Sequence, residues 1–202
     1  MARINPVTSA TWDVELPFTA KPHKVGSSSF AIISDLPKKA DVSAMGDWVA
    51  NGVAIYSVSG DPVTADQSLA ALMIAHLRLG DDGRIHVPVR IKLPASGTYS
   101  REELALPALR KIDLSGKIGL EVRYQDSAWH TIVVSLQEGV STDLQVGDIL
   151  ISETASKAAF NSPQAFERAA KAQAAKGAEK LSLEILRGGT SQNAELQLDA
   201  QK

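Results

Sequence analysis

The chain has 202 residues, a formal net charge of −2 and no cysteine. This length allows one large domain or two of about 100 residues, each able to bury a core. The lack of cysteine excludes disulfides, thiolate zinc sites and a cysteine nucleophile. Residues 1–100 carry nine basic and nine acidic side chains, and residues 101–202 carry twelve and fourteen. Neither half has the positive charge that many phosphate contacts require, so we expect no nucleic-acid partner.

Apolar stretches are too short to cross a bilayer. The run from Leu69 to Leu79 is interrupted by His76 and Arg78, and the amino terminus has no apolar signal core. We therefore expect no membrane span in this chain. It is either a cytoplasmic protein or a soluble piece of a longer one.

The first half predicts strands around one helix. Trp12, Val14 and Leu16 alternate with acidic residues, which indicates a strand. Asp66 is placed to cap a helix that runs to about Leu79. Pro88 marks its strand as an edge strand or a bulged one. The expected strands are residues 12–16, 30–33, 52–58 and 85–91.

The second half repeats this pattern after a predicted linker at residues 94–103, which holds Pro94 and Gly97. Ser162-Pro163 predicts a helix start, and Gly177 predicts its end. The expected strands are residues 118–122, 131–134, 149–151, 181–186 and 194–198. Leu104 to Ile112 has no assigned strand and could hold a helical turn.

Corresponding elements of the two halves lie 95 residues apart. Gly52 and Gly147 each open a strand, Ala70 and Ala165 each lie in a helix, and the strands after these helices match in the same way. Repetition at this period predicts two domains of one kind.

The second half resembles a PDZ domain, in particular the bacterial type of high-temperature-requirement serine proteases and type II secretion components. The resemblance covers about residues 112–200. It rests on Lys117–Leu120, on Leu144–Leu150 with its Gly-Asp pair, and on the helix from Ser162 followed by the strand up to Gly189.

The resemblance implies a mixed α/β fold that is mainly antiparallel β. It would consist of two PDZ-like domains, each a small, strongly bent sheet or partial barrel capped by one long and one short helix. The first domain would comprise residues 11–93, and the second would comprise residues 104–200 after the linker.

A peptide-binding site in the second domain also follows from the resemblance. A partner's extended segment or carboxyl terminus would add as a strand beside Leu120–Val122, with its carboxylate on backbone amides near Gly119. Phe166 would line the groove, and Ser162 would contact the peptide or, as we favour, cap the helix. The peptide-binding residues are then Lys117, Ile118, Gly119, Leu120, Glu121, Val122, Ser162 and Phe166. A second reading stays open, in which Ile118, Leu120 and Phe166 are core residues.

The first half departs from this pattern. Its equivalent of the carboxylate loop is Glu15–Phe18, where Pro17 replaces the expected glycine and removes a donor. The first domain could bind internal segments, pack against its neighbour or bind no peptide.

Catalysis is not expected. The four histidines are scattered, no hydrolase or phosphate-binding motif appears, and the pairs Asp81-Asp82 and Glu102-Glu103 are typical of solvated charge. We expect no metal and no cofactor. The resemblance implies a periplasmic or cell-envelope location, with the cytoplasm as the alternative.

The expected function is therefore peptide or protein binding, with the second domain capturing an extended or carboxyl-terminal peptide by strand addition. The implied setting is a bacterial envelope protease or secretion assembly. The alternative is a structural or oligomerisation platform, built from two degenerate PDZ-like domains without a ligand, and a homo-oligomer fits that alternative.

Overall fold

A computed structural model describes residues 9–38 and 41–197 of the chain. It divides into two compact units. We name residues Asp13–Ala108 the central unit. The terminal unit is formed by the described residues on both sides of it in the sequence, so the central unit is an insertion in the terminal one.

The central unit is built on antiparallel strands with two short helices. Its strand β6 alternates strictly, burying Ile85, Val87, Val89 and Ile91 while the residues between them face outward. Its elements are β2 (Thr19–Val25), β3 (Ser28–Ser34), α1 (Val42–Met45), β4 (Ala54–Val58), β5 (Asp61–Pro62), α2 (Leu69–Ala75) and β6 (Arg84–Lys92).

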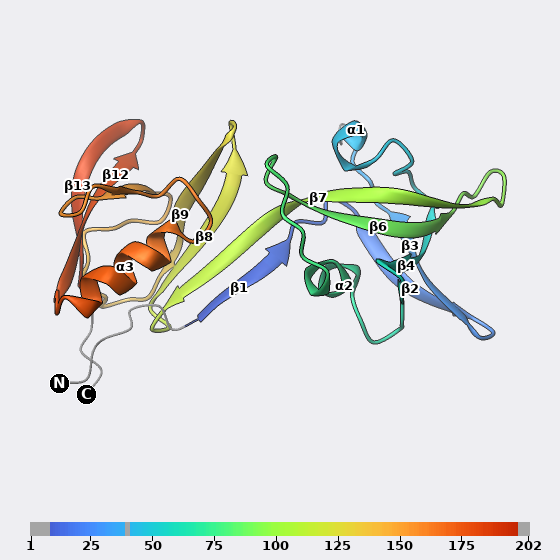
Figure 1. The fold of residues 1–202 in the computed structure, drawn as a ribbon, viewed down its shortest axis with the longest axis horizontal. Helices are drawn as coiled ribbons and strands as arrows, with labels where there is room; N and C mark the ends of the chain where they lie inside the picture. The colour runs from blue at the N-terminus through green and yellow to red at the C-terminus, as the bar shows by residue number, and fades with distance from the viewer. Residues whose placement is uncertain (1–8, 39–40, 198–202) are drawn as a thin grey trace. The chain divides into compact units, whose positions relative to one another are not determined.

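The terminal unit has one helix of 11 residues, α3 (Ala165–Ala175), packed on a sheet (Figure 1). Phe166 and Ala170 of this helix are fully buried in a core that also contains Leu120, Val122 and Leu183. The strands are β8 (Ile118–Gln125), β9 (Ala128–Leu136), β10 (Ile149–Glu153), β11 (Ala158–Ala159), β12 (Lys180–Arg187) and β13 (Thr190–Gln197).

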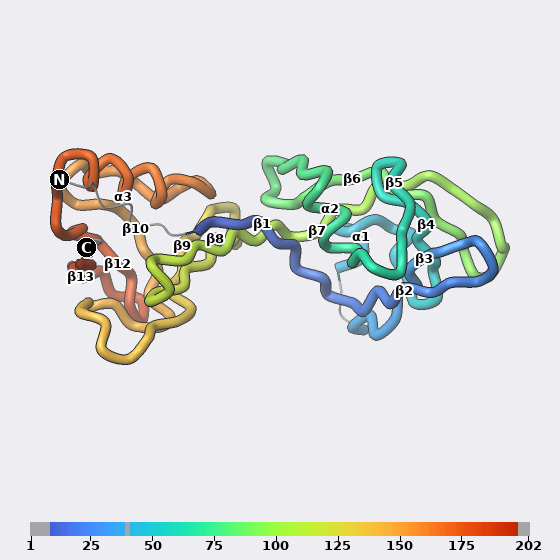
Figure 2. The backbone as a smooth tube through the Cα atoms, turned by 90° about the horizontal axis from the view of Figure 1, so that it is seen from below, coloured from blue at the N-terminus to red at the C-terminus, as the bar shows by residue number. Residues whose placement is uncertain are grey.

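Two strands belong to both units, β1 (Ser9–Val14) and the 16-residue β7 (Tyr99–Leu114). β7 pairs with β6 through Tyr99–Pro107 and with β8 through Leu109–Leu114. The strand order is β13-β12-β10-β9-β8-β7-β6-β4-β3-β2, with β1 on β7, β5 on β4 and β11 on β10. Figure 2 traces this path through the backbone.

The expected fold class is wrong. Antiparallel pairing prevails, but the described strands form one continuous 13-stranded ladder and not two separate sheets. The three helices are short, and they do not supply one long and one short helix to each unit. The predicted linker at 94–103 is also wrong, because Tyr99 already begins β7.

β7 explains both errors. Its charged start, with Arg101, Glu102 and Glu103, resembles a linker, yet Leu104, Leu106, Leu109 and Ile112 are buried further along the same strand. A strand that crosses two cores has no single alternating pattern, because the neighbours that bury its side chains change along its length.

Helix starts also differ from the expectation. Ser68, and not Asp66, caps α2, because its hydroxyl accepts a hydrogen bond from the Ala71 amide at 3.1 Å. Helix α3 begins at Ala165 after Gln164, whose side chain makes no capping bond.

The predicted repeat agrees with the order of elements. Each unit has a hairpin (β2–β3 or β8–β9), then a strand with a two-residue partner, a helix and a further strand. Both ladders also shift register at matching positions, between Ile55 and Ser57 in β4 and between Leu150 and Ser152 in β10. These positions are 95 residues apart, as the sequence predicts.

None of the helices in the described ranges is both long enough and apolar enough to traverse a bilayer.

Candidate functional site

Strand β8 carries most of the predicted peptide-binding residues, and both of its edges are already paired. On one side Leu120 faces Ile112 of β7, and on the other it faces Val133 of β9. The position beside Leu120–Val122 at which a peptide was expected to add is thus taken by the chain's own β7.

Gly119 lies within β8, opposite Asp113, and not in a loop of converging amides. Its backbone is not in the left-handed region, in contrast to Gly116 of the preceding turn. A Cβ at position 119 would collide with the hydroxyl of Ser135. Close packing between strands accounts for this glycine, and Lys117 lies in the turn before the strand.

The second reading, that the apolar members of the predicted site are core residues, fits the structure. Phe166 is fully buried and packs edge-on against Phe160, with ring centroids 5.4 Å apart. Ile118, Leu120 and Val122 lie in the same core. Ser162 precedes α3 and does not cap it; its hydroxyl accepts a hydrogen bond from Arg168 at 2.7 Å.

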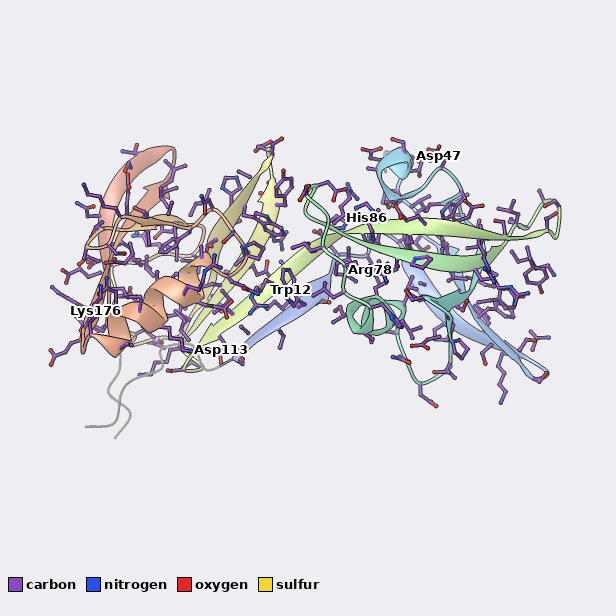
Figure 3. All side chains as sticks on the ribbon, viewed as in Figure 1. Trp12, Asp47, Arg78, His86, Asp113 and Lys176 are labelled. Carbon is purple, nitrogen blue, oxygen red and sulfur yellow. The ribbon has the colours of Figure 1, made fainter. Side chains whose placement is uncertain are left out.

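An ion pair ties β7 to α3 in the terminal unit. The Arg110 guanidinium donates to both carboxylate oxygens of Glu167, one at 2.9 Å, and both side chains are mostly buried. The ring of Trp12 in β1, labelled in Figure 3, lies 5.1 Å from the same guanidinium. These contacts hold the strand that covers β8 in place.

Three predicted residues do meet in a shallow hollow of about 220 Å³ on the terminal unit. Gly119, Leu120 and Glu121 line it with residues of β1, β7 and β9. The walls from β1 and β7 stand where the resemblance places a peptide.

The Gly-Asp stretch that carries the resemblance is structural. Asp148 is 1% exposed and accepts hydrogen bonds from the Gln145 amide and from two nitrogens of Arg187, at 2.7–2.8 Å. The Arg187 guanidinium holds the pKa of Asp148 below its usual value, against the effect of burial. This ion pair fixes the turn before β10 to the end of β12.

Glu153 closes β10 in a similar way. Burial acts to raise the pKa of Glu153, but hydrogen bonds from Ser156, Ala155 and Gln173 outweigh it and hold that pKa below its usual value. The carboxylate organises the turn after β10 and joins it to α3.

Strand β2 of the central unit is the last strand of the sheet, so one of its edges has no partner among the described residues. Val25 and Ser28 close a two-residue turn in which Gly26 has φ 61°. Val25 is therefore hydrogen-bonded to β3, and along β2 every second residue from Val25 makes such bonds. The amides and carbonyls of Lys24, Pro22 and Ala20 therefore point away from β3. No residue within 9–38 or 41–197 pairs with that edge. Figure 1 shows this hairpin extending from the central unit.

A row of four rings crosses the same sheet. We name His23 (β2), Phe30 (β3), Tyr56 (β4) and Tyr99 (β7) the aromatic row. Neighbouring ring centroids are 6.0, 5.1 and 5.2 Å apart, and the first pair is stacked with an interplanar angle of 17°. A hydrogen bond between the two tyrosines raises the pKa of Tyr56. His23 is the end of the row at the free edge.

Cations surround both ends of the aromatic row. Arg90 and Lys92 lie over the ring of Tyr99, at 4.9 and 5.3 Å from its centroid. Lys21 and Lys24 flank His23 on β2, and neither makes an ion pair with any described residue. The free edge is therefore positively charged although the whole chain is not.

His86, labelled in Figure 3, forms a second charged cluster. Its ring nitrogens lie 2.9 Å from Glu103 and 3.0 Å from Asp82. The hydrogen bond to Glu103 raises the pKa of His86; burial opposes this, and Asp82 adds to it. Over residues 9–38 and 41–197, no group of three His, Asp or Glu side chains is arranged to hold a metal ion.

The expected strands leave out residues 19–25, so the sequence did not reveal the β2 edge. Pro22 and the glycine-serine run are typical of a turn, and β2 shows no alternation of buried and exposed residues that would indicate a strand. A proline is compatible with an edge strand where its missing amide would point outward, and Pro22 occupies such a position.

Comparison with known proteins adds no family. The chain matches no protein-family model, and no curated protein is significantly similar to it.

Proposed function

We propose that this chain is a non-catalytic protein-binding module that takes an extended internal segment of a partner as an added strand on β2. The observation that carries the proposal is the difference between the two candidate edges. β8 is paired on both sides, whereas β2 has an unpaired edge that spans seven residues.

The geometry of β2 supports a partial set of backbone bonds. An antiparallel segment would exchange two hydrogen bonds with Lys24 and two with Ala20, but only one with Pro22, which has no amide hydrogen. These five hydrogen bonds are enough to define the register of the added segment on β2. The donor that Pro22 lacks lowers the affinity for any added strand. An internal segment suits this edge, because Pro17 in the preceding loop removes a donor that a terminal carboxylate would need.

Selection of a peptide-display library on the full chain tests the proposal. Enriched peptides should slow hydrogen exchange of the Ala20 and Lys24 amides, which face outward. The double variant Ala20→Pro/Lys24→Pro removes both remaining outward donors without removing a bond to β3, so it should weaken binding at least tenfold. Ala20→Ser/Lys24→Arg, which keeps both amides and the positive charge, is the matched control and should retain binding within about threefold.

Two results would overturn the proposal. One is no enrichment on a chain that is folded by circular dichroism. The other is enriched peptides that leave the exchange of both amides unchanged. The exchange readout uses the natural sequence, so it decides the matter even where the proline variant fails to fold.

A further inference from the structure

The side chains of β2 define which segment the edge accepts. We infer that the partner segment carries an aromatic residue opposite His23 and acidic residues opposite Lys21 and Lys24. This inference rests on the proposed function and adds the chemistry of the partner to it.

The aromatic position follows from the geometry of the row. An added strand places one side chain beside His23 on the face that carries Phe30. Since His23 bonds inward to β3, its outer pairing is a non-hydrogen-bonded one, in which facing Cα atoms are only about 4.5 Å apart. A ring at that position would continue the stack that already joins His23 and Phe30.

The acidic positions follow from charge. Lys21 and Lys24 have no anionic partner among the described residues, and each would face one residue of the added strand directly. Opposite charges across a strand pair attract, and like charges repel. Lysines on an edge strand disfavour the addition of neutral or basic strands, because their charge is then left without an opposite charge. The same two lysines therefore favour an acidic segment over other segments.

A second copy of the chain fits this edge poorly. β2 (Thr19–Val25) contains no acidic residue, so antiparallel pairing of β2 with itself would leave Lys21 and Lys24 without an opposite charge in any register. A nucleic acid also fits poorly, because successive bases stack on a series of ring faces. Here Phe30 stacks on His23, Tyr56 and Tyr99 meet edge-on at 64°, and Arg90 and Lys92 lie over the ring of Tyr99. The row therefore offers a single stacking position, at its His23 end.

The order of the motif can be written for an antiparallel segment. From its amino end, the segment faces Val25, Lys24, His23, Pro22 and Lys21 in turn. The expected sequence is therefore apolar, acidic, aromatic, any residue, acidic, and Val-Glu-Phe-Thr-Glu within a ten-residue peptide is a suitable probe.

Titration of the full chain with four peptides tests the inference: the probe, the form with both Glu replaced by Lys, the form with Phe replaced by Ala, and the reversed sequence. We expect the probe to bind about five- to twentyfold more tightly than the peptide with both Glu replaced by Lys, at low salt. Replacement of Phe by Ala should cost about two- to tenfold. Lys21→Glu/Lys24→Glu should reverse the charge preference, and the Lys-containing peptide should then bind more tightly than the original probe.

The controls separate this inference from the proposed function. Lys171→Glu/Lys176→Glu makes the same charge change on two exposed residues, one in α3 and one directly after it, and should leave the preference unchanged. If the peptides protect the Ala20 and Lys24 amides equally well whatever their charge and ring, the inference fails and strand addition stands. If the probe gives no protection while library peptides do, the inference also fails; if no peptide protects these amides, both fail. If peptides add parallel to β2, the chain should bind the reversed sequence more tightly than the probe. That result would overturn the stated motif.

Discussion

The first strands of the two hairpins, β2 and β8, occupy corresponding places in the repeated order of elements but differ in what lies beside them. β8 is covered by β7 and contributes Ile118, Leu120 and Val122 to a core. β2 is left open, and its last five residues are exposed. The availability of an edge therefore depends on the strand that the chain places next to it, and not on the hairpin's own sequence.

We expect the largest difference between the two strands when β7, the strand that covers β8, is weakened. Ile112 of β7 is 2% exposed in the terminal core, so Ile112→Ala should lower the free energy of unfolding by about 2–5 kcal/mol. Lys24→Ala on β2 should change it by less than about 0.5 kcal/mol. Urea unfolding followed by circular dichroism measures both. Equal effects would contradict the view that β7 is a fixed part of the core.

Loss of the Arg110–Glu167 ion pair should have the next largest effect. Arg110→Ala leaves the mostly buried Glu167 without its partner and should cost about 1.5–3 kcal/mol. The variant Glu167→Gln/Arg110→Ala should recover part of that loss. A double-mutant cycle on the free energy of unfolding measures the coupling, and additive effects would show that the pair does not hold β7 to α3.

The two units should also respond differently to pH. The raised pKa of His86 in the central unit means that its stabilisation is complete below about pH 6.5 and is lost as the pH rises through the folded-state value. The lowered pKa values of Asp148 and Glu153 mean that their stabilisation is present above about pH 4 and is lost as the pH falls.

Urea unfolding of the natural chain and of His86→Gln checks the central unit. The difference in their free energies of unfolding should shrink as the pH rises from 5 to 9. A difference that stays constant over this range would show that the charge of His86 does not contribute. Asp148→Asn should behave in the opposite sense, with its difference shrinking as the pH falls below about 4.

The smallest effect concerns Pro22. Pro22→Ala should restore the missing donor and tighten binding of a strand-adding peptide by about two- to tenfold. It should also lower the free energy of unfolding by about 0.4–1 kcal/mol, because the unfolded chain gains freedom. Peptide titration and urea unfolding test the two parts, and unchanged affinity would place the peptide elsewhere than on β2.

Local patterns predicted several elements, although not the fold class. The strand expected at residues 85–91 lies within β6, and the period of 95 residues agrees with the order of elements in the two units. Pairing between distant strands could not be read in this way. Gly119 looked like a loop residue, and only the register of β8 with β9 shows that it is a strand residue packed on Ser135.

The resemblance implies a peptide-binding site in the terminal unit, whereas the site that we propose lies on β2 of the central unit. The residues that carry the resemblance, such as Asp148 and Phe166, are explained by burial and pairing within the terminal unit. Two features of β2 matter: within residues 9–38 and 41–197, one edge has no partner strand, and Lys21 and Lys24 have no ion-pair partner. Both are properties of the strand's surroundings. No local spacing of residues reports them.

The insertion of the central unit has a consequence for how the chain is made. Trp12 of the terminal unit is synthesised early, whereas its partner Arg110 and the Glu167 that binds Arg110 follow only after the whole central unit. During synthesis the central unit can complete its own core first, since domains generally fold as units. The start of β1 therefore lacks its partners in the terminal unit until nearly the end of translation. A pause before α3 is made would prolong the exposure of Trp12.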